Sequence, residues 1–138
     1  MSNIHLIFHG AVILFLANLM GFPLGRAMAS KHSMPEKKDA WRMAHSATSG
    51  FGVFLLATAG CIPYLILTLE QKNTLIVALI LSGYGFFVGS LLAALSGQRG
   101  LRMKMPIANL SAHLCYLVGI LGSMIGVPLI VYGAWNAF

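Results

Sequence analysis

Charged side chains are scarce in this chain, and acidic ones are the scarcest. Only 9% of the 138 residues are charged, and Asp and Glu together number three. Soluble domains average about 25% charged and about 45–50% apolar residues, whereas 58% of this chain is hydrophobic. The composition excludes an ordinary soluble domain and predicts an integral membrane protein with one domain over residues 1–138.

Several chemical motifs are also missing. No Asp or Glu lies deep in an apolar segment, which argues against a proton-coupled transporter or pump, because buried carboxylates usually hold the ion in such proteins. Cys61 and Cys115 lie in apolar segments outside any CxxCH motif, so covalent c-type haem attachment is excluded. No glycine-rich phosphate loop and no HExxH zinc motif occurs.

Four long apolar segments make up most of the chain. A spanning helix needs about 20 mostly apolar residues, and lipid admits only helices and closed barrels because every backbone group must be hydrogen-bonded. Membrane strands are shorter and alternate in polarity. The sequence therefore predicts an all-α integral membrane four-helix bundle, with helices at about residues 4–29, 43–69, 73–97 and 108–137.

Lysine and arginine are distributed unevenly among the predicted loops. Eight of the nine fall in or beside the first and third loops, and the middle loop has only Lys72. By the positive-inside rule the first and third loops face the cytoplasm, so both termini are expected on the outer, periplasmic side of a bacterial inner membrane. The same rule accounts for the net charge of +6 without a nucleic-acid partner. The eight residues are Arg26, Lys31, Lys37, Lys38, Arg42, Arg99, Arg102 and Lys104.

Small residues recur at four-residue spacing in three of the predicted helices. Such rows let helices approach closely in lipid. We expect them mainly to pack the four helices on one another, while some serve contacts in an oligomer. The rows are Gly21 with Gly25, Gly85 with Gly89, Ala93 and Gly97, and Gly122 with Gly126.

His45 is the most informative polar residue, because it lies just inside the cytoplasmic end of the second predicted helix. An ionisable side chain in a membrane needs a partner, and imidazole is a common ligand of haem iron. Ser49 and Gly52 follow on the same helix face and form a smooth stripe against which a flat macrocycle can lie. A hydrogen bond from His45 to a neighbouring helix is the simpler alternative.

Three arginines are expected at the same membrane level as His45. Arg42 precedes it by three residues, and Arg99 and Arg102 lie in the third loop. Guanidinium groups pair with carboxylates in a bidentate manner, so these residues are candidates for binding haem propionates.

His113 is a second candidate ligand or catalytic group. It lies near the cytoplasmic end of the fourth predicted helix, at a depth similar to that of His45, so the two could ligate one haem from both faces. A hydrogen bond between helices is again the alternative. His9 starts at the outer side, about 20 Å or more from His45 if the helices span fully, which argues against a shared iron within one chain.

Several motifs resemble the styrene oxide isomerase family, in the same order along the chain. The resemblance covers nearly all of the sequence and is clearest between Trp41 and Leu101. The matching motifs are His9-Gly10, Trp41-x-x-Ala44-His45-Ser46, Ser96-Gly97-Gln98-Arg99-Gly100-Leu101 and Tyr116-Leu117-Val118-Gly119.

The resemblance implies a small bacterial membrane enzyme of four helices that assembles as a homotrimer. Family members bind haem b at subunit interfaces through a histidine that matches His45. Ferric iron acts there as a Lewis acid on an epoxide oxygen, and the epoxide becomes an aldehyde without redox change. For this chain the resemblance implies haem b as cofactor, His45 as the metal ligand, and a small apolar substrate that enters from the lipid bilayer.

The chain departs from the family at three active-site positions. Phe51, Ser82 and Ser90 stand where characterised members have Asn, Asp and Tyr. Tyr84 and His113 are the candidate catalytic residues that could compensate for this loss. Two other functions stay open: a non-enzymatic b-type haem protein with His45 and His113 as axial ligands, and a small membrane subunit without haem.

Overall fold

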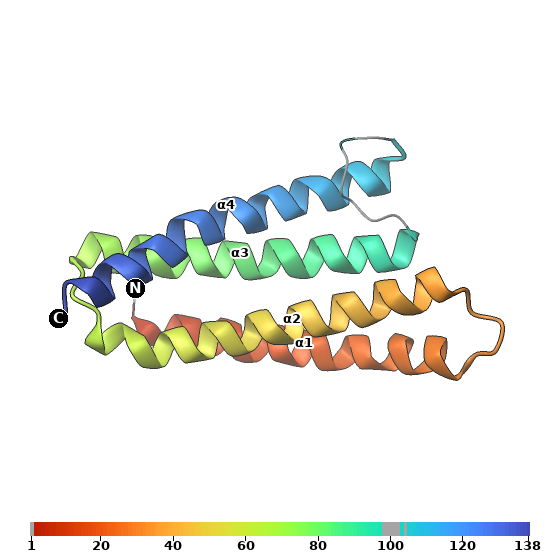
Figure 1. The fold of residues 1–138 in the computed structure, drawn as a ribbon, viewed down its shortest axis with the longest axis horizontal. Helices are drawn as coiled ribbons and strands as arrows, with labels where there is room; N and C mark the ends of the chain where they lie inside the picture. The colour runs from red at the N-terminus through yellow and green to blue at the C-terminus, as the bar shows by residue number, and fades with distance from the viewer. Residues whose placement is uncertain (1, 98–102, 104) are drawn as a thin grey trace.

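The computed structural model describes residues 2–97, 103 and 105–138 of the chain, and four long helices dominate it (Figure 1). No strand occurs in these residues. Each long helix is apolar and long enough to cross a membrane, so the all-α, multi-pass prediction is confirmed. The helices are α1 (Asn3–Ala29), α2 (Pro35–Cys61), α3 (Leu69–Ser96) and α4 (Ile107–Trp135), with a short 3-10 turn, η1 (Ile62–Tyr64), after α2.

The second helix begins and ends about two turns earlier than the sequence predicted. Pro35 occupies its first turn, where a missing N–H costs nothing, and Glu36 in the same turn suits the positive end of the helix dipole. Pro63 lies in the η1 turn that ends the helix. Hydrophobicity marks the part of a helix that lies in lipid, and α2 continues beyond that part into the polar loop.

Local signals fix both ends of α3. The Thr68 side chain accepts a hydrogen bond from the Gln71 backbone N–H at 3.2 Å, and the Thr68 N–H donates to Gln71 Oε1 at 2.9 Å. This reciprocal capping box satisfies two N–H groups that the helix leaves unpaired. At the other end Gly97 adopts a left-handed conformation, with φ 69°, which glycine tolerates without strain.

The helices pack as two antiparallel pairs, α1 with α2 and α3 with α4, and α2 contacts α3 between them (Figure 1). Glycines allow the close approach of α3 and α4. A Cβ placed on Gly85 would lie 2.6 Å from the Gly119 nitrogen and 2.8 Å from the Cys115 oxygen, and one on Gly122 would lie 2.9 Å from the Ser82 Cβ. Gly85, Gly89, Gly122 and Gly126 therefore pack on the facing helix within the chain, as expected for most rows. Gly97, at the end of the α3 row, has nothing within 4 Å of its Cβ position.

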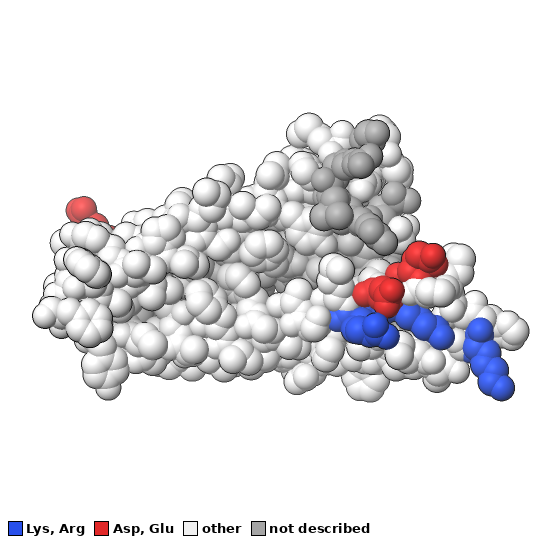
Figure 2. Space-filling model, in the orientation of Figure 1, with Lys and Arg blue, Asp and Glu red and all other residues white. Residues whose placement is uncertain are grey.

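Both termini and the α2–α3 connection lie at one end of the molecule, and the α1–α2 connection lies at the other (Figure 1). The prediction that the termini share a side is thus confirmed for the chain itself. Figure 2 shows Lys and Arg gathered at the α1–α2 end. The basic residues of the first loop thus lie together at one end of the bundle. The periplasmic position of the termini stays a prediction.

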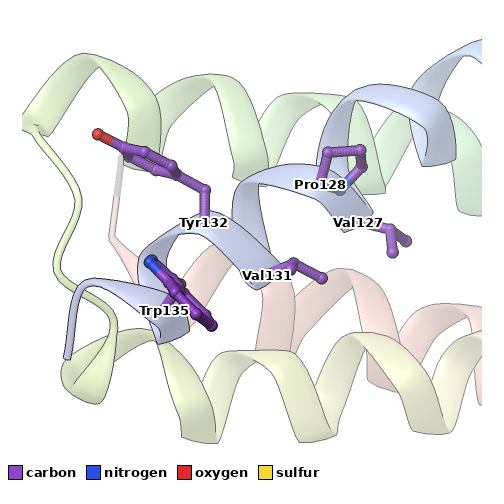
Figure 3. A pocket seen from close by; sticks show the side chains of 5 residues that line it. All are labelled: Val127, Pro128, Val131, Tyr132 and Trp135. Atoms are coloured by element: carbon purple, nitrogen blue, oxygen red, sulfur yellow. The ribbon is translucent and has the colours of Figure 1, made fainter. Parts of the chain in front are cut away.

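The outer faces of the helices expose large apolar side chains along their length. Phe22 on α1 is 74% exposed and Met124 on α4 is 68% exposed. Surfaces of this kind need lipid or another apolar surface to cover them. A shallow apolar hollow of about 530 Å³ lies on the last turns of α4, at the end opposite to the α1–α2 connection, and is lined by Val127, Pro128, Val131, Tyr132 and Trp135 (Figure 3).

Candidate functional site

The His45 imidazole extends from α2 to α1, where its Nδ1 lies 2.8 Å from the carbonyl oxygen of Ala17. A carbonyl oxygen can only accept, so Nδ1 is the protonated nitrogen and donates this hydrogen bond. In the neutral ring Nε2 then has its lone pair free. No hydrogen bond to Nε2 occurs among those that the described residues make. A second-sphere hydrogen bond of this kind is the usual way in which proteins orient a metal-binding histidine.

The face of α1 beside His45 has no side chains at Gly21 and Gly25, so it leaves open space next to the ring. A Cβ placed on Gly21 would have one neighbour within 4 Å, the His45 Cε1 at 3.9 Å, and a Cβ on Gly25 would have none. The sequence predicts that most of the glycine rows pack the four helices and that some serve an oligomer. Within this chain the row of Gly21 and Gly25 does not bring two helix backbones together, because only the His45 ring lies near it. Their spacing equals that of the packed rows, so the sequence held no signal that separates an open row from a filled one.

Gly52 differs from the expectation in the opposite way. It is buried, and a Cβ there would lie 2.7 Å from Leu14 Cγ and 3.0 Å from the Leu14 nitrogen. Its missing side chain allows α1 to approach α2, so Gly52 does not provide an open wall for a macrocycle in this chain. Ser49, one turn after His45 on the same helix, is half-buried. The smooth surface next to the imidazole is thus provided mainly by α1 rather than by α2.

Arg42 is exposed on the first part of α2 and donates from Nη1 to Asp39 Oδ1 at 3.1 Å. Its Nη2 lies 3.7 Å from the Met28 sulfur on α1. Exposed ion pairs of this type contribute little to stability, so the guanidinium can exchange Asp39 for another carboxylate. Arg99 and Arg102, the other two predicted propionate partners, lie outside the described residues.

His113 and His45 lie on α4 and α2, which do not form one of the main packed helix pairs of the chain. His113 is half-buried in the second turn of α4, and α4 packs mainly against α3, whereas the His45 ring faces α1. Among the described residues no interaction joins the two histidines. Two axial ligands stand on opposite faces of a haem and do not contact each other, so a bis-histidine site, within one chain or between two, stays a prediction.

Tyr84 lies in a different place from His45. Its hydroxyl oxygen is 2.9 Å from His9 Nδ1, and the two rings meet edge to face at 85°. His9 precedes Ala17 by about two helical turns, roughly 12 Å along α1. The sequence indicates Tyr84 as a candidate residue but does not predict its pairing with His9, because no local pattern links residues that are 75 positions apart.

Ser82, Ser90 and Phe51, which stand at the three divergent positions, all make contacts within or between helices. The Ser82 hydroxyl donates to the Gly119 carbonyl at 2.6 Å in the α3–α4 contact, and the Ser90 hydroxyl donates to the Phe87 carbonyl at 3.0 Å. Phe51 stacks at a tilt on Phe86, with ring centroids 5.5 Å apart. None of the three directs a polar group toward the His45 imidazole.

Comparison with known proteins gives one match. The family model described as styrene oxide isomerase matches residues 2–135, which is nearly the whole chain. No curated protein and no solved structure matches the chain. Among the described residues, no group of three or more His, Cys, Asp and Glu is placed to hold a metal ion.

Proposed function

Because this chain belongs to the styrene oxide isomerase family, we propose that it binds haem b through His45 and isomerises a small apolar epoxide to a carbonyl compound. The reaction class and the haem cofactor both follow from the family, and the free Nε2 of His45 supports haem binding. We further propose that the protein acts as a homotrimer in the bacterial inner membrane and takes its substrate from the bilayer.

The single observation that supports haem binding best is the state of the two His45 nitrogens. His45 Nδ1–H donates a hydrogen bond to the Ala17 carbonyl oxygen at 2.8 Å, so Nε2 has no proton and its lone pair is free to bind a metal. A haem needs one or two axial ligands from protein, and one imidazole meets that need. The low surface at Gly21 and Gly25 leaves space beside the ring for a flat group.

The chain contributes binding, orientation and exclusion of water to this reaction. His45 would hold the iron, and Arg42, with Arg99 and Arg102, would pair with the propionates. When bound, ferric haem would supply a Lewis acid that polarises the epoxide oxygen. In a bilayer the exposed apolar side chains around the helices would face lipid, and water-poor surroundings favour isomerisation of the epoxide over its hydrolysis.

A haem protein without isomerase activity is the second candidate. It is favoured by the packed positions of Phe51, Ser82 and Ser90, which offer no polar group to orient an epoxide. In this candidate His113, from the same or a second chain, would hold the haem together with His45.

An absorption spectrum with and without carbon monoxide tests both candidates. Protein purified from cells supplied with haem should show a Soret band, and a folded, colourless preparation would refute haem binding. The reduced protein should bind carbon monoxide readily, because the isomerase needs an open iron position. Refusal of carbon monoxide that is reversed by His113→Ala would reject the isomerase and establish the bis-histidine protein.

A further inference from the structure

His9 on α1 and Tyr84 on α3 form a polar pair that the proposed reaction at His45 does not use. The His9 Nδ1 and the Tyr84 hydroxyl oxygen are 2.9 Å apart. Phe8 stacks edge-on against the imidazole, with ring centroids 5.2 Å apart, and Tyr84 also packs against the larger apolar core cluster. The pair is therefore held in place from two sides.

The His9–Tyr84 pair has two hydrogen-bond donor groups, but the bond between the two residues needs only one of them. A neutral imidazole has one N–H and a phenol has one O–H. One of these two donors forms the bond between His9 and Tyr84, and the other is left over. The described residues offer no hydrogen-bond partner for the second donor.

The chemistry of the two groups decides which donor is left over. An imidazole nitrogen is a far stronger base than a phenol oxygen, so the Tyr84 O–H donates to His9 Nδ1. The proton of the His9 ring then resides on Nε2, and this N–H is the surplus donor. Tyr84 fixes the tautomer of His9, much as the Ala17 carbonyl fixes that of His45.

The surplus N–H is reachable from outside the chain. No buried side-chain nitrogen or oxygen among the described residues lacks a partner, so the unpaired His9 Nε2 has access to the surface. Ile4 and Phe8 give this stretch of α1 a large apolar surface, each 62% exposed, and His5, one turn before His9, is exposed beside them with its Nδ1 3.2 Å from the Ser2 carbonyl oxygen. In lipid an unpaired donor is costly because no water is present to bind it. An apolar molecule with an acceptor oxygen can accept a hydrogen bond from His9 Nε2–H and at the same time cover the neighbouring apolar side chains.

We infer that His9 and Tyr84 form a binding site for an uncharged apolar molecule that has an acceptor oxygen, such as an ether, epoxide or ketone. Its oxygen accepts from His9 Nε2–H, and its apolar part lies against α1. The site is roughly 12 Å along α1 from the level of His45, and it does not depend on whether haem is bound there.

Acetophenone bound to the protein in lipid nanodiscs tests this site. Its carbonyl stretching band should move to lower wavenumber than in empty nanodiscs, because the oxygen accepts a hydrogen bond. α-Methylstyrene has the same shape with CH₂ in place of the oxygen, and it should bind roughly tenfold more weakly after correction for lipid partition, which is the effect of about one hydrogen bond. Equal binding of the two probes, or an unshifted band, would overturn the site.

Variants locate the effect. His9→Leu should abolish the band shift and the preference for acetophenone, and His9→Asn, which keeps an acceptor for Tyr84 near the Nδ1 position, should do the same while preserving the contact between helices. Tyr116→Phe, which removes a phenol from α4, is the matched control and should bind as the parent does. A shift that persists in folded His9→Asn would show that the pair only ties α1 to α3.

A final variant separates this site from the one at His45. In His45→Ala the shifted band should remain at full strength, whether or not the parent protein contains haem. Loss of the band in that variant would place the probe at His45 and overturn the inference. The Soret band tests the proposed function independently, so failure of either proposal is recognised without reference to the other.

Discussion

His45 shows that two interpretations of a membrane histidine need not exclude each other. A hydrogen bond to a neighbouring helix and a metal-binding role competed when only the sequence was considered. In the structure the hydrogen bond exists, at 2.8 Å from Nδ1 to the Ala17 oxygen, and it leaves the other nitrogen free. The two ring nitrogens are distinct. The hydrogen bond of Nδ1 orients the ring, and Nε2 can still bind a metal.

Replacement of His45 tests this role. His45→Ala should lose haem, with the Soret absorbance per protein falling by at least about tenfold, because metal sites lose roughly 10–100-fold in affinity even when only a supporting group is removed. Helicity should stay close to that of the parent. His32→Ala, in the exposed loop between α1 and α2, is the control and should retain the full band. An unchanged spectrum in His45→Ala would assign the ligand to another residue.

Gly21 provides a second test at the scale of single residues. Gly21→Leu places a large side chain where only the His45 ring is near, so the fold should survive while haem affinity falls by about tenfold, since overpacking costs about 1–3 kcal/mol. Haem titration of the purified protein measures the change. Gly60→Leu, at a helical glycine that has nothing within 4 Å of its Cβ position, should bind haem normally. Equal affinity in both variants would remove Gly21 from the site.

In the α3–α4 pair, glycine lets the two helix backbones come into direct contact, with no side chain between them. The Cβ position of Gly85 meets backbone atoms of Gly119 and Cys115 at 2.6 and 2.8 Å. Backbone cannot rotate away as a side chain can, so close approach here requires glycine. In lipid, where apolar surface gives no driving force, such van der Waals contact is a main source of helix association.

The cost of disrupting this contact can be measured. Gly85→Ala should destabilise the folded protein by about 1–3 kcal/mol, the usual cost of overpacking, and should lower the thermal midpoint in detergent. Gly50→Ala is the matched control, because Gly50 is also helical but has nothing within 4 Å of its Cβ position. It should leave stability equal or raise it by up to about 1 kcal/mol, since alanine has the higher helix propensity. A harmless Gly85→Ala would show that the two helices are not packed this closely.

The elements also show where sequence reasoning is weakest. Hydropathy found four helices and placed α1 and α4 closely, but it displaced both ends of α2, because Pro35 and Pro63 determine those ends rather than the limits of the apolar segment. Gly52 and Gly21 illustrate the same limit in packing. Both are helical glycines, yet one is covered by Leu14 and the other is open, and only the crossing of α1 and α2 decides which.

For the whole molecule, the arrangement of termini and charges predicts a topology. Both ends of the chain lie opposite to the basic α1–α2 connection (Figure 1, Figure 2), and basic loops remain in the cytoplasm. A C-terminal alkaline phosphatase fusion should therefore be active in the periplasm, and a fusion after Lys31 should be inactive. The same two positions fused to green fluorescent protein should give the opposite pattern. An inactive C-terminal phosphatase fusion would invert the topology.

The amino-acid sequence alone specifies the class of this protein: four helices long and apolar enough to span a membrane, termini at the same end of the bundle, and membership of the styrene oxide isomerase family. These properties follow from composition, the distribution of charge and short motifs, which are local in the chain. The packing of the helices specifies which nitrogen of His45 is free, which glycines are open, and that His9 contacts Tyr84. Those facts depend on contacts between helices that are distant in sequence, and a pattern along one chain cannot specify such contacts because the same spacing serves a filled and an open surface equally well.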